Sequence, residues 1–129
     1  VFFPGGNIGE LAVNGTINTS DAREKTNIRP LNYGLTEVLQ LKPVRFQWKN
    51  GTEAGDKLGL VAQDLQEVLP EIVVSSTWRE NDDGSRTRVL ADRLGVYYSD
   101  IIPVLVNAIQ QQQQQIEALR QEIEALKDR

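Results

Sequence analysis

The stretch that decides the fold is SDIIPVLVNAIQQQQQQIEALRQEIEALKDR, which covers residues 99–129. Its apolar residues recur at alternating spacings of three and four positions over about three and a half heptads, which is the pattern of a coiled coil. The positions of this predicted seam are Ile102, Leu105, Ile109, Gln112, Ile116, Leu119, Ile123 and Leu126. The sequence therefore predicts a long C-terminal helix that associates with copies of itself.

The predicted helix begins near Ser99, a good N-cap residue, and Pro103 is tolerated because it falls in the first turn. Gln112 is the polar residue of the seam, where we expect it to fix the register or the oligomeric state. Isoleucine at the a positions with leucine at the d positions by itself favours two strands. Charged residues lie outside the seam, as on a solvated flank. They are Glu117, Arg120, Glu122, Glu124 and Lys127.

Upstream of this helix, the sequence predicts a small domain of mixed helices and strands. Residues 71–78 and 86–91 predict two strands around the polar turn at 81–84. Residues 62–69 predict a helix that ends before Pro70. The side chains that this helix is expected to bury are Ala62, Leu65, Val68 and Leu69.

A second pair of strands and a short helix are predicted further upstream. Val44, Phe46 and Trp48 alternate with polar residues, which predicts a half-buried strand. Residues 57–61 are its expected return strand, and apolar residues at helical spacing within 35–39 predict a short helix. The expected fold class is α+β, with the long C-terminal helix forming a parallel coiled coil.

The stretch from Ser20 to Asn27 carries the candidate chemistry, because a serine and a lysine stand five positions apart at Ser20 and Lys25. A structural interpretation of the same residues is a helix start. In that interpretation Ser20 or Asp21 caps free amides, and Glu24 completes a capping box. The two interpretations are compatible with each other.

Three further blocks accompany the S-D-x-R-x-K pattern of Ser20 to Lys25. They are LKPVRFQWK at 41–49, GLVAQD at 59–64 and YSDII at 98–102. In this order, and followed by the long helix, the four blocks resemble the peptidase S74 family. That family is the self-cleaving intramolecular chaperone domain at the C-terminus of trimeric phage tail fibres and tailspikes, and it also occurs in myelin-regulatory-factor-like transcription factors.

The resemblance implies that the chain cuts its own backbone between Thr19 and Ser20. Ser20 would be the nucleophile and the new N-terminus, and Lys25 the general base. Asp21, Arg23 and Gln63 are the residues expected to support the site; for Gln63 a solvated helix end is the alternative interpretation. The resemblance also implies a homotrimer, and we follow it over the two-stranded preference of the seam.

The residue types fit this chemistry. A serine hydroxyl needs a neighbouring base, and the chain contains no histidine. A lysine has an ordinary pKa of about 10.4, so it is almost fully protonated at neutral pH unless burial favours its neutral form. Attack on the preceding carbonyl is intramolecular, which favours it strongly. The expected intermediate is an ester that water hydrolyses.

Three parts are expected along the chain. Residues 1–19 are interpreted as the end of an upstream β-structured fibre shaft, with a disordered terminus as the alternative. Residues 20–98 are the expected chaperone and auto-processing domain, and residues 99–129 the oligomerisation helix. Because the sequence has no methionine, we expect it to be a piece of a longer protein.

A folding role follows from this layout. Intertwined strands from three chains pair slowly, and a coiled coil would align the chains and raise their local concentration. We hypothesise that Lys25 loses its proton only when trimer assembly buries it, so that cleavage reports correct assembly. The expected partners are two further copies of the chain and the upstream shaft. The expected location is the host cytoplasm during assembly and the virion tail fibre or spike afterwards.

Composition excludes several other classes of function. A net charge of −4 disfavours nonspecific binding to nucleic acid. The absence of cysteine and histidine excludes disulfides and thiolate or imidazole metal sites, and no cofactor is expected. The best apolar run, residues 101–106, is too short for a membrane span, so no membrane partner is expected.

Two other functions stay open. The first is a non-catalytic module that trimerises and caps a fibre, in which Ser20 and Lys25 are structural. The second is a receptor-binding fibre tip, with Trp48, Trp78 and the tyrosines contacting sugar. A tip needs exposed aromatic side chains, whereas the alternation of residues 44–49 places Trp48 on the apolar face.

Overall fold

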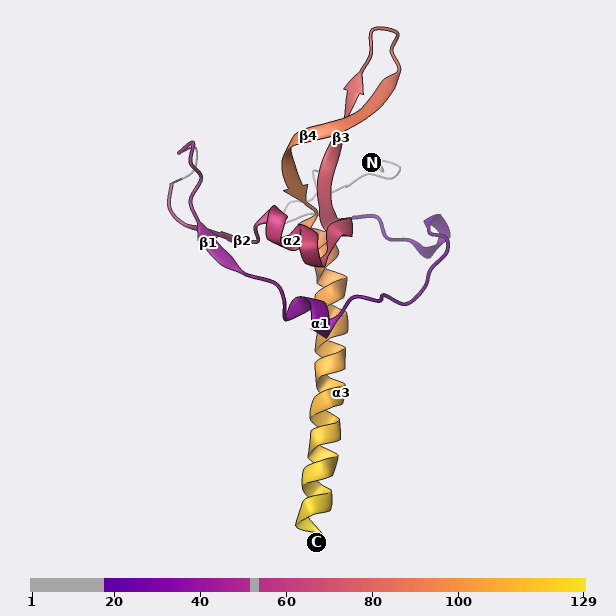
Figure 1. Ribbon diagram of the computed structural model, residues 1–129. Coiled ribbons are helices and arrows are strands. Elements are labelled where there is room, and N and C mark those ends of the chain that lie inside the picture. Colours follow the sequence, from indigo (N-terminus) through magenta and orange to yellow (C-terminus); the bar gives the residue numbers. More distant parts are fainter. Residues whose placement is uncertain (1–17, 52–53) are drawn as a thin grey trace. The chain divides into compact units, whose positions relative to one another are not determined.

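The computed structural model describes residues 18–51 and 54–129 (Figure 1). The chain divides into two units, Val1–Pro30 and Leu31–Arg129, and each is described by itself. The first unit contains the 3₁₀ helix η2 (Ala22–Glu24). Most of the expected shaft end, residues 1–17, lies outside the described residues.

The second unit combines helices with two antiparallel hairpins, which confirms the mixed helix and strand class. The first hairpin pairs β1 (Val44–Phe46) with β2 (Lys57–Gly59). The second hairpin pairs β3 (Val73–Glu80) with β4 (Arg86–Val96), and an irregularity in register lies between Val74 and Ser76. All four strands fall where the sequence predicts them, although β4 runs past the predicted end at residue 91.

A polar turn closes the second hairpin. The Asn81 amide donates to the Ser85 carbonyl oxygen over 2.8 Å, and the Asn81 side chain donates to the hydroxyls of Ser85 and Thr87. Gly84 has a φ of +85°, a left-handed conformation that glycine adopts without steric cost. Hydrogen bonds from the Ser85 hydroxyl and amide lower the pKa of Asp83. The turn is therefore held by its own polar side chains, as the composition of residues 81–84 predicts.

Three helices complete the second unit. They are α1 (Leu35–Val38), α2 (Ala62–Val68) and α3 (Ile101–Lys127). The 3₁₀ turn η3 (Pro70–Ile72) connects α2 to β3, and η4 (Tyr98–Asp100) connects β4 to α3. The expectation that Ser99 is the N-cap of the long helix is wrong. Ser99 lies inside η4, and Asp100 at the N-cap position already has helical backbone angles, so one turn runs into the next.

The core of the second unit is small and lies where α2 meets the beginning of α3. Leu65 is 2% exposed and Leu69 is fully buried, as the sequence predicts for the helix at 62–69. The cluster of buried side chains comprises Leu65, Leu69, Ile72, Ile101 and Val104. Partly buried side chains of helices, loops and strands pack against it; they are Tyr33, Val38, Leu41, Leu60, Val68, Val73 and Val96.

Helix α3 carries two apolar stripes with different environments. Ile101, Val104 and Ala108 are buried within the second unit. The residues of the predicted seam are between 40% and 65% exposed, and Gln112 is exposed as well. Figure 1 shows the C-terminal half of α3 running beyond the other elements of its unit, and every residue from 112 to 129 is exposed. Along most of α3, the apolar side chains of the predicted seam are therefore exposed to solvent in the single chain.

The environment of Trp48 differs from the expectation. Strand β1 ends at Phe46, so the alternation that would bury Trp48 stops before it. Trp48 is 51% exposed and packs edge to face on Phe46, with ring centroids 5.0 Å apart. Trp78 is 61% exposed. The prediction that Trp48 lies on a buried face is wrong.

Candidate active site

Ser20 and Lys25 lie in direct contact in the first unit. The Lys25 Nζ atom donates a hydrogen bond to Ser20 Oγ over 2.6 Å. The short helix η2 lies between the two residues, and the Lys25 amide closes it by donating to the Ala22 carbonyl oxygen over 3.1 Å. One tight turn therefore brings side chains five positions apart to the same point.

The turn is held by Asp21 and Arg23. Asp21 is the N-cap of η2, and its Oδ1 accepts the Arg23 amide over 2.9 Å. The Arg23 guanidinium also donates hydrogen bonds to the Asp21 carboxylate, from Nη2 to Oδ2 over 2.7 Å and from Nε to each oxygen over 3.2 Å. These side-chain and amide hydrogen bonds from Arg23 lower the pKa of Asp21. The helix-start interpretation therefore holds for Asp21, and it coexists with the Ser20 to Lys25 contact.

The direction of the Ser20 to Lys25 hydrogen bond matters for the chemistry. As a donor, Nζ has its proton and only orients the hydroxyl. A general base needs the reverse bond, in which a neutral amine accepts the proton of Oγ at the same separation. Both side chains are exposed to water in the single chain. Their 2.6 Å separation is within the hydrogen-bonding distance that a general base and a serine hydroxyl require.

Gln63, the third expected support residue, lies in the second unit. It is the second residue of α2, and its side chain is exposed. A contribution of Gln63 to the Ser20 site stays a prediction.

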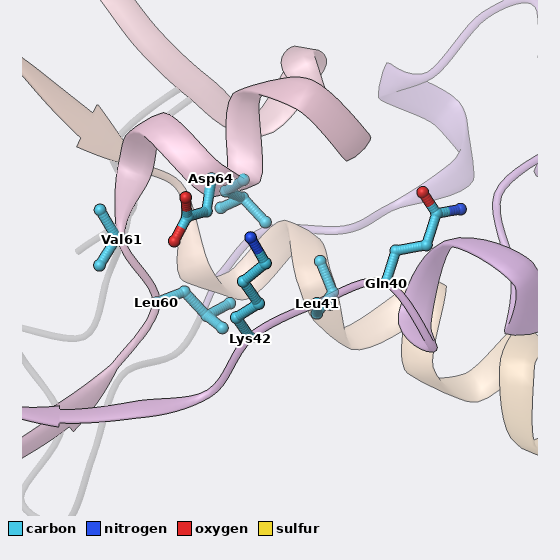
Figure 2. Close-up of a pocket in the computed structure, with 7 residues that line it drawn as sticks. Gln40, Leu41, Lys42, Leu60, Val61 and Asp64 are labelled. Carbon is cyan, nitrogen blue, oxygen red and sulfur yellow. The ribbon is translucent and has the colours of Figure 1, made fainter.

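The second unit contains a small cavity between α2 and the loop that leads into β1. Its volume is about 10 Å³, which is about the space of one water molecule. Figure 2 shows Lys42 and Asp64 among the side chains that line this cavity. Ligand sites for small molecules usually measure about 300 Å³ or more. This cavity is therefore too small to hold a substrate.

Within residues 18–51 and 54–129, no group of acidic side chains is arranged to hold a metal ion. No helix among the same residues is long and apolar enough to span a membrane.

The family comparison covers three of the four blocks seen in the sequence, those within residues 20–25, 41–49 and 59–64. Residues 20–74 match the sequence model of Peptidase_S74, described as the chaperone of endosialidase. Over residues 20–74 the chain is therefore similar to the Peptidase_S74 family. This Peptidase_S74 segment begins at Ser20, the residue whose hydroxyl contacts Lys25.

Two curated relatives of the chain are phage fibre proteins. The chain is 35% identical over 74 residues to the long tail fiber protein Gp37 of Enterobacteria phage K3 and to that of Enterobacteria phage T2. The aligned part is 55% of this chain but only 6% and 5% of the two relatives. The chain thus spans a small fraction of the length of these fibre proteins.

Proposed function

We propose that this chain is a self-cleaving intramolecular chaperone for a fibre. Residues 99–129 join three copies, an upstream shaft ending in residues 1–19 folds on that assembly, and residues 20–98 then cut the Thr19–Ser20 bond. The observation that carries the proposal is the 2.6 Å contact between Lys25 Nζ and Ser20 Oγ, at the residue where the family match begins. The names of the Gp37 relatives support a fibre as the parent protein.

The proposed reaction uses only groups of this chain and water. Neutral Lys25 takes the Ser20 hydroxyl proton as Oγ attacks the Thr19 carbonyl carbon. The Thr19–Ser20 amide bond breaks, and the proton passes from Lys25 to the departing Ser20 nitrogen. The products of this step are a Thr19 ester on Oγ and a free α-amine. Water then hydrolyses the ester, which leaves a carboxylate on Thr19 and restores the Ser20 hydroxyl.

Assembly is proposed to switch the reaction on. In the single chain the Lys25 ammonium is exposed, and the apolar seam of α3 is exposed as well. Association through the seam covers apolar surface, and covering the dyad in the same event favours the neutral amine. Cleavage then follows correct trimerisation. The trimer itself is taken from the fibre relationship, because isoleucine at a and leucine at d alone favour two strands.

Cleavage after folding has a physical use in a fibre. The coiled coil aligns three chains while their strands pair, which is slow because distant segments must meet. Once residues 20–129 are cut away, the shaft lacks a template for refolding. Its lifetime is then governed by its unfolding rate. We place the reaction in the host cytoplasm during assembly and the released shaft in the virion tail fibre or spike.

The test is the intact mass of the purified chain beside two variants of the dyad. Wild type should yield a fragment beginning at Ser20, whereas Ser20→Ala and Lys25→Ala should stay whole. Lys42→Ala serves as the matched control, because Lys42 is another exposed lysine and lies in the second unit. A Lys25→Ala chain that is cut at the wild-type rate would remove Lys25 from the mechanism.

The same measurement separates the proposal from its main alternative. A non-catalytic trimerisation and capping module would show one uncut mass in wild type and in all three variants. The exposure of Trp48 and Trp78 is what a sugar-binding fibre tip would need. Loss of cell binding on replacing both tryptophans, with cleavage unchanged, would identify that additional role.

A further inference from the structure

The first turns of α3 carry a shallow groove beside the predicted seam. Its volume is about 450 Å³. Ile102 belongs to both the groove and the seam, and Leu31 contributes from outside the helix but within the same unit. The described residues that line the groove carry no charge; they are Leu31, Ile102, Pro103, Val106, Asn107 and Gln110.

The heptad of the seam shows which side of α3 the groove occupies. With Ile102 at an a position and Leu105 at a d position, Val106 is an e residue, and Pro103 and Gln110 are b residues. At 3.6 residues per turn, the e and b positions form one flank of the seam, and the g and c positions form the other. The groove therefore lies on the e flank and is continuous with the seam through Ile102.

The opposite flank of the same turns is covered by the chain itself. Ile101 and Ala108 at g positions and Val104 at a c position are at most 7% exposed. Ile101 and Val104 belong to the core cluster, together with Leu65 and Leu69 in and directly after α2. The two flanks of this part of α3 therefore differ, because one is covered by the α2 side of the domain and the other carries the open groove.

Apolar side chains on the e flank occur only where the g flank is covered. In the groove, Leu31 is 40% exposed and Val106 is 47% exposed. Every residue from 112 to 129 is exposed, so the cover of the g flank ends before that point. The e and b positions of this uncovered part are all polar or charged; they are Gln113, Glu117, Arg120, Glu124 and Lys127.

This match identifies an occupant for the groove. In a parallel coiled coil the g positions of one helix lie beside the e positions of the next helix. Since Ile101 at g packs with the α2 region, the α2 side of one copy is brought beside the e flank of its neighbour. We propose that the groove is a second docking surface between copies of this chain, in which the α2 side of the neighbouring copy covers Leu31 and Val106. The inference rests on the assembly proposed above and adds a contact that a coiled coil alone does not make.

Docking in the groove would fix the register of the copies. The seam repeats every seven residues, so a shift of one heptad still pairs isoleucine and leucine along much of its length. The groove and the α2 side occur at one level of α3, so they meet only when the helices are parallel and in register. Strands of an upstream shaft need the same alignment to pair correctly.

The test is thiol labelling, because the chain has no cysteine of its own. Leu31→Cys is the informative site, since Leu31 lies outside α3 and a coiled coil by itself would leave it open. Its labelling rate is compared between the assembled chain and the variant Ile109→Asp with Ile116→Asp, which places charges in the seam to keep the chain monomeric. Leu90→Cys is the control, because Leu90 is 84% exposed on β4.

Assembly should slow the labelling of Leu31→Cys by at least about 10-fold, which corresponds to docking favoured by about 1.4 kcal/mol. Labelling of Leu90→Cys should be equal in the two backgrounds. Sedimentation gives a second measurement, in which Leu31→Asn and Val106→Asn should each weaken association at least about 20-fold, because three half-exposed side chains lose their burial. Leu90→Asn should associate like wild type. If the asparagine variants fail to fold, the labelling result decides alone.

Equal labelling of Leu31→Cys in the assembled and monomeric chains would overturn the inference. Slow labelling already in the monomeric variant would overturn it as well, because the cover would then come from the same chain. Wild-type association of both Leu31→Asn and Val106→Asn would also contradict it. A wild-type chain that sediments as a monomer would instead contradict the proposed assembly. Loss of cleavage plays no part in these measurements, so failure of the proposed dyad leaves the docking surface standing.

Discussion

The link between assembly and cleavage can be broken by two charges on α3. Ile109 and Ile116 are a-position residues seven apart in the predicted seam, and they are 65% and 44% exposed in the single chain. Together they expose apolar surface equal to about one whole isoleucine side chain per chain. Burying that surface in the seam contributes about 1.5–3 kcal/mol. Across three chains, the variant Ile109→Asp with Ile116→Asp should therefore lose about 5–9 kcal/mol of association free energy.

That loss corresponds to about four to six orders of magnitude in the association constant, before the cost of bringing six carboxylates together. The double variant should sediment as a monomer and leave the Thr19–Ser20 bond intact. The matched control is Gln114→Asp with Gln121→Asp, which places the same charges at the same spacing on f positions and should assemble and cleave normally. A monomeric double variant that cleaves at the wild-type rate would refute the coupling.

Three further predictions concern stability and the turn that holds the dyad. Leu65→Ala should cost about 2–5 kcal/mol of unfolding free energy, because Leu65 is 2% exposed at the centre of the core; thermal denaturation measures it, and no change would contradict the assigned core. Gly84→Ala should destabilise the hairpin by about 1–2 kcal/mol, because alanine disfavours the left-handed φ of this residue. No steric clash adds to this cost, since nothing lies within 4 Å of an added Cβ. Hydrogen exchange of the amides in β3 and β4 measures the effect. Hydrogen bonds from Arg23 hold the pKa of Asp21 below its ordinary 3.8. The turn should therefore be fully formed above pH 3.8 and loosen as the pH falls through the lowered pKa, which NMR titration of Asp21 would show. An unshifted titration would contradict the Asp21–Arg23 contact.

Local patterns predicted much of this fold because they report on neighbouring residues. Alternation and turn chemistry located both hairpins, and helical spacing identified Leu65 and Leu69 as buried. The resemblance to the peptidase S74 family pointed to Ser20 and Lys25 as a pair, and the structure places their side chains in contact. Their catalytic roles depend on surroundings that a single chain does not supply.

Features that the sequence did not predict correctly involve residues whose role depends on a distant partner or on where a strand or helix ends. Gln111 is one of six consecutive glutamines, so its sequence context indicated no special role. Its side chain accepts a hydrogen bond from the Leu35 amide, which lies 76 positions away. The heptad pattern of α3 revealed its outward stripe but not Ile101, Val104 and Ala108, whose cover comes from other elements. Trp48 was misassigned because alternation was extended past the end of β1.

The proposed function depends above all on activation of the Ser20 hydroxyl by the amine of Lys25. The most direct measurement is a time course of intact mass for wild type and for Lys25→Arg, which keeps the positive charge but cannot act as a base. The account predicts that assembled wild type is converted to residues 20–129 and that assembled Lys25→Arg is not. Conversion of Lys25→Arg at the wild-type rate would contradict it.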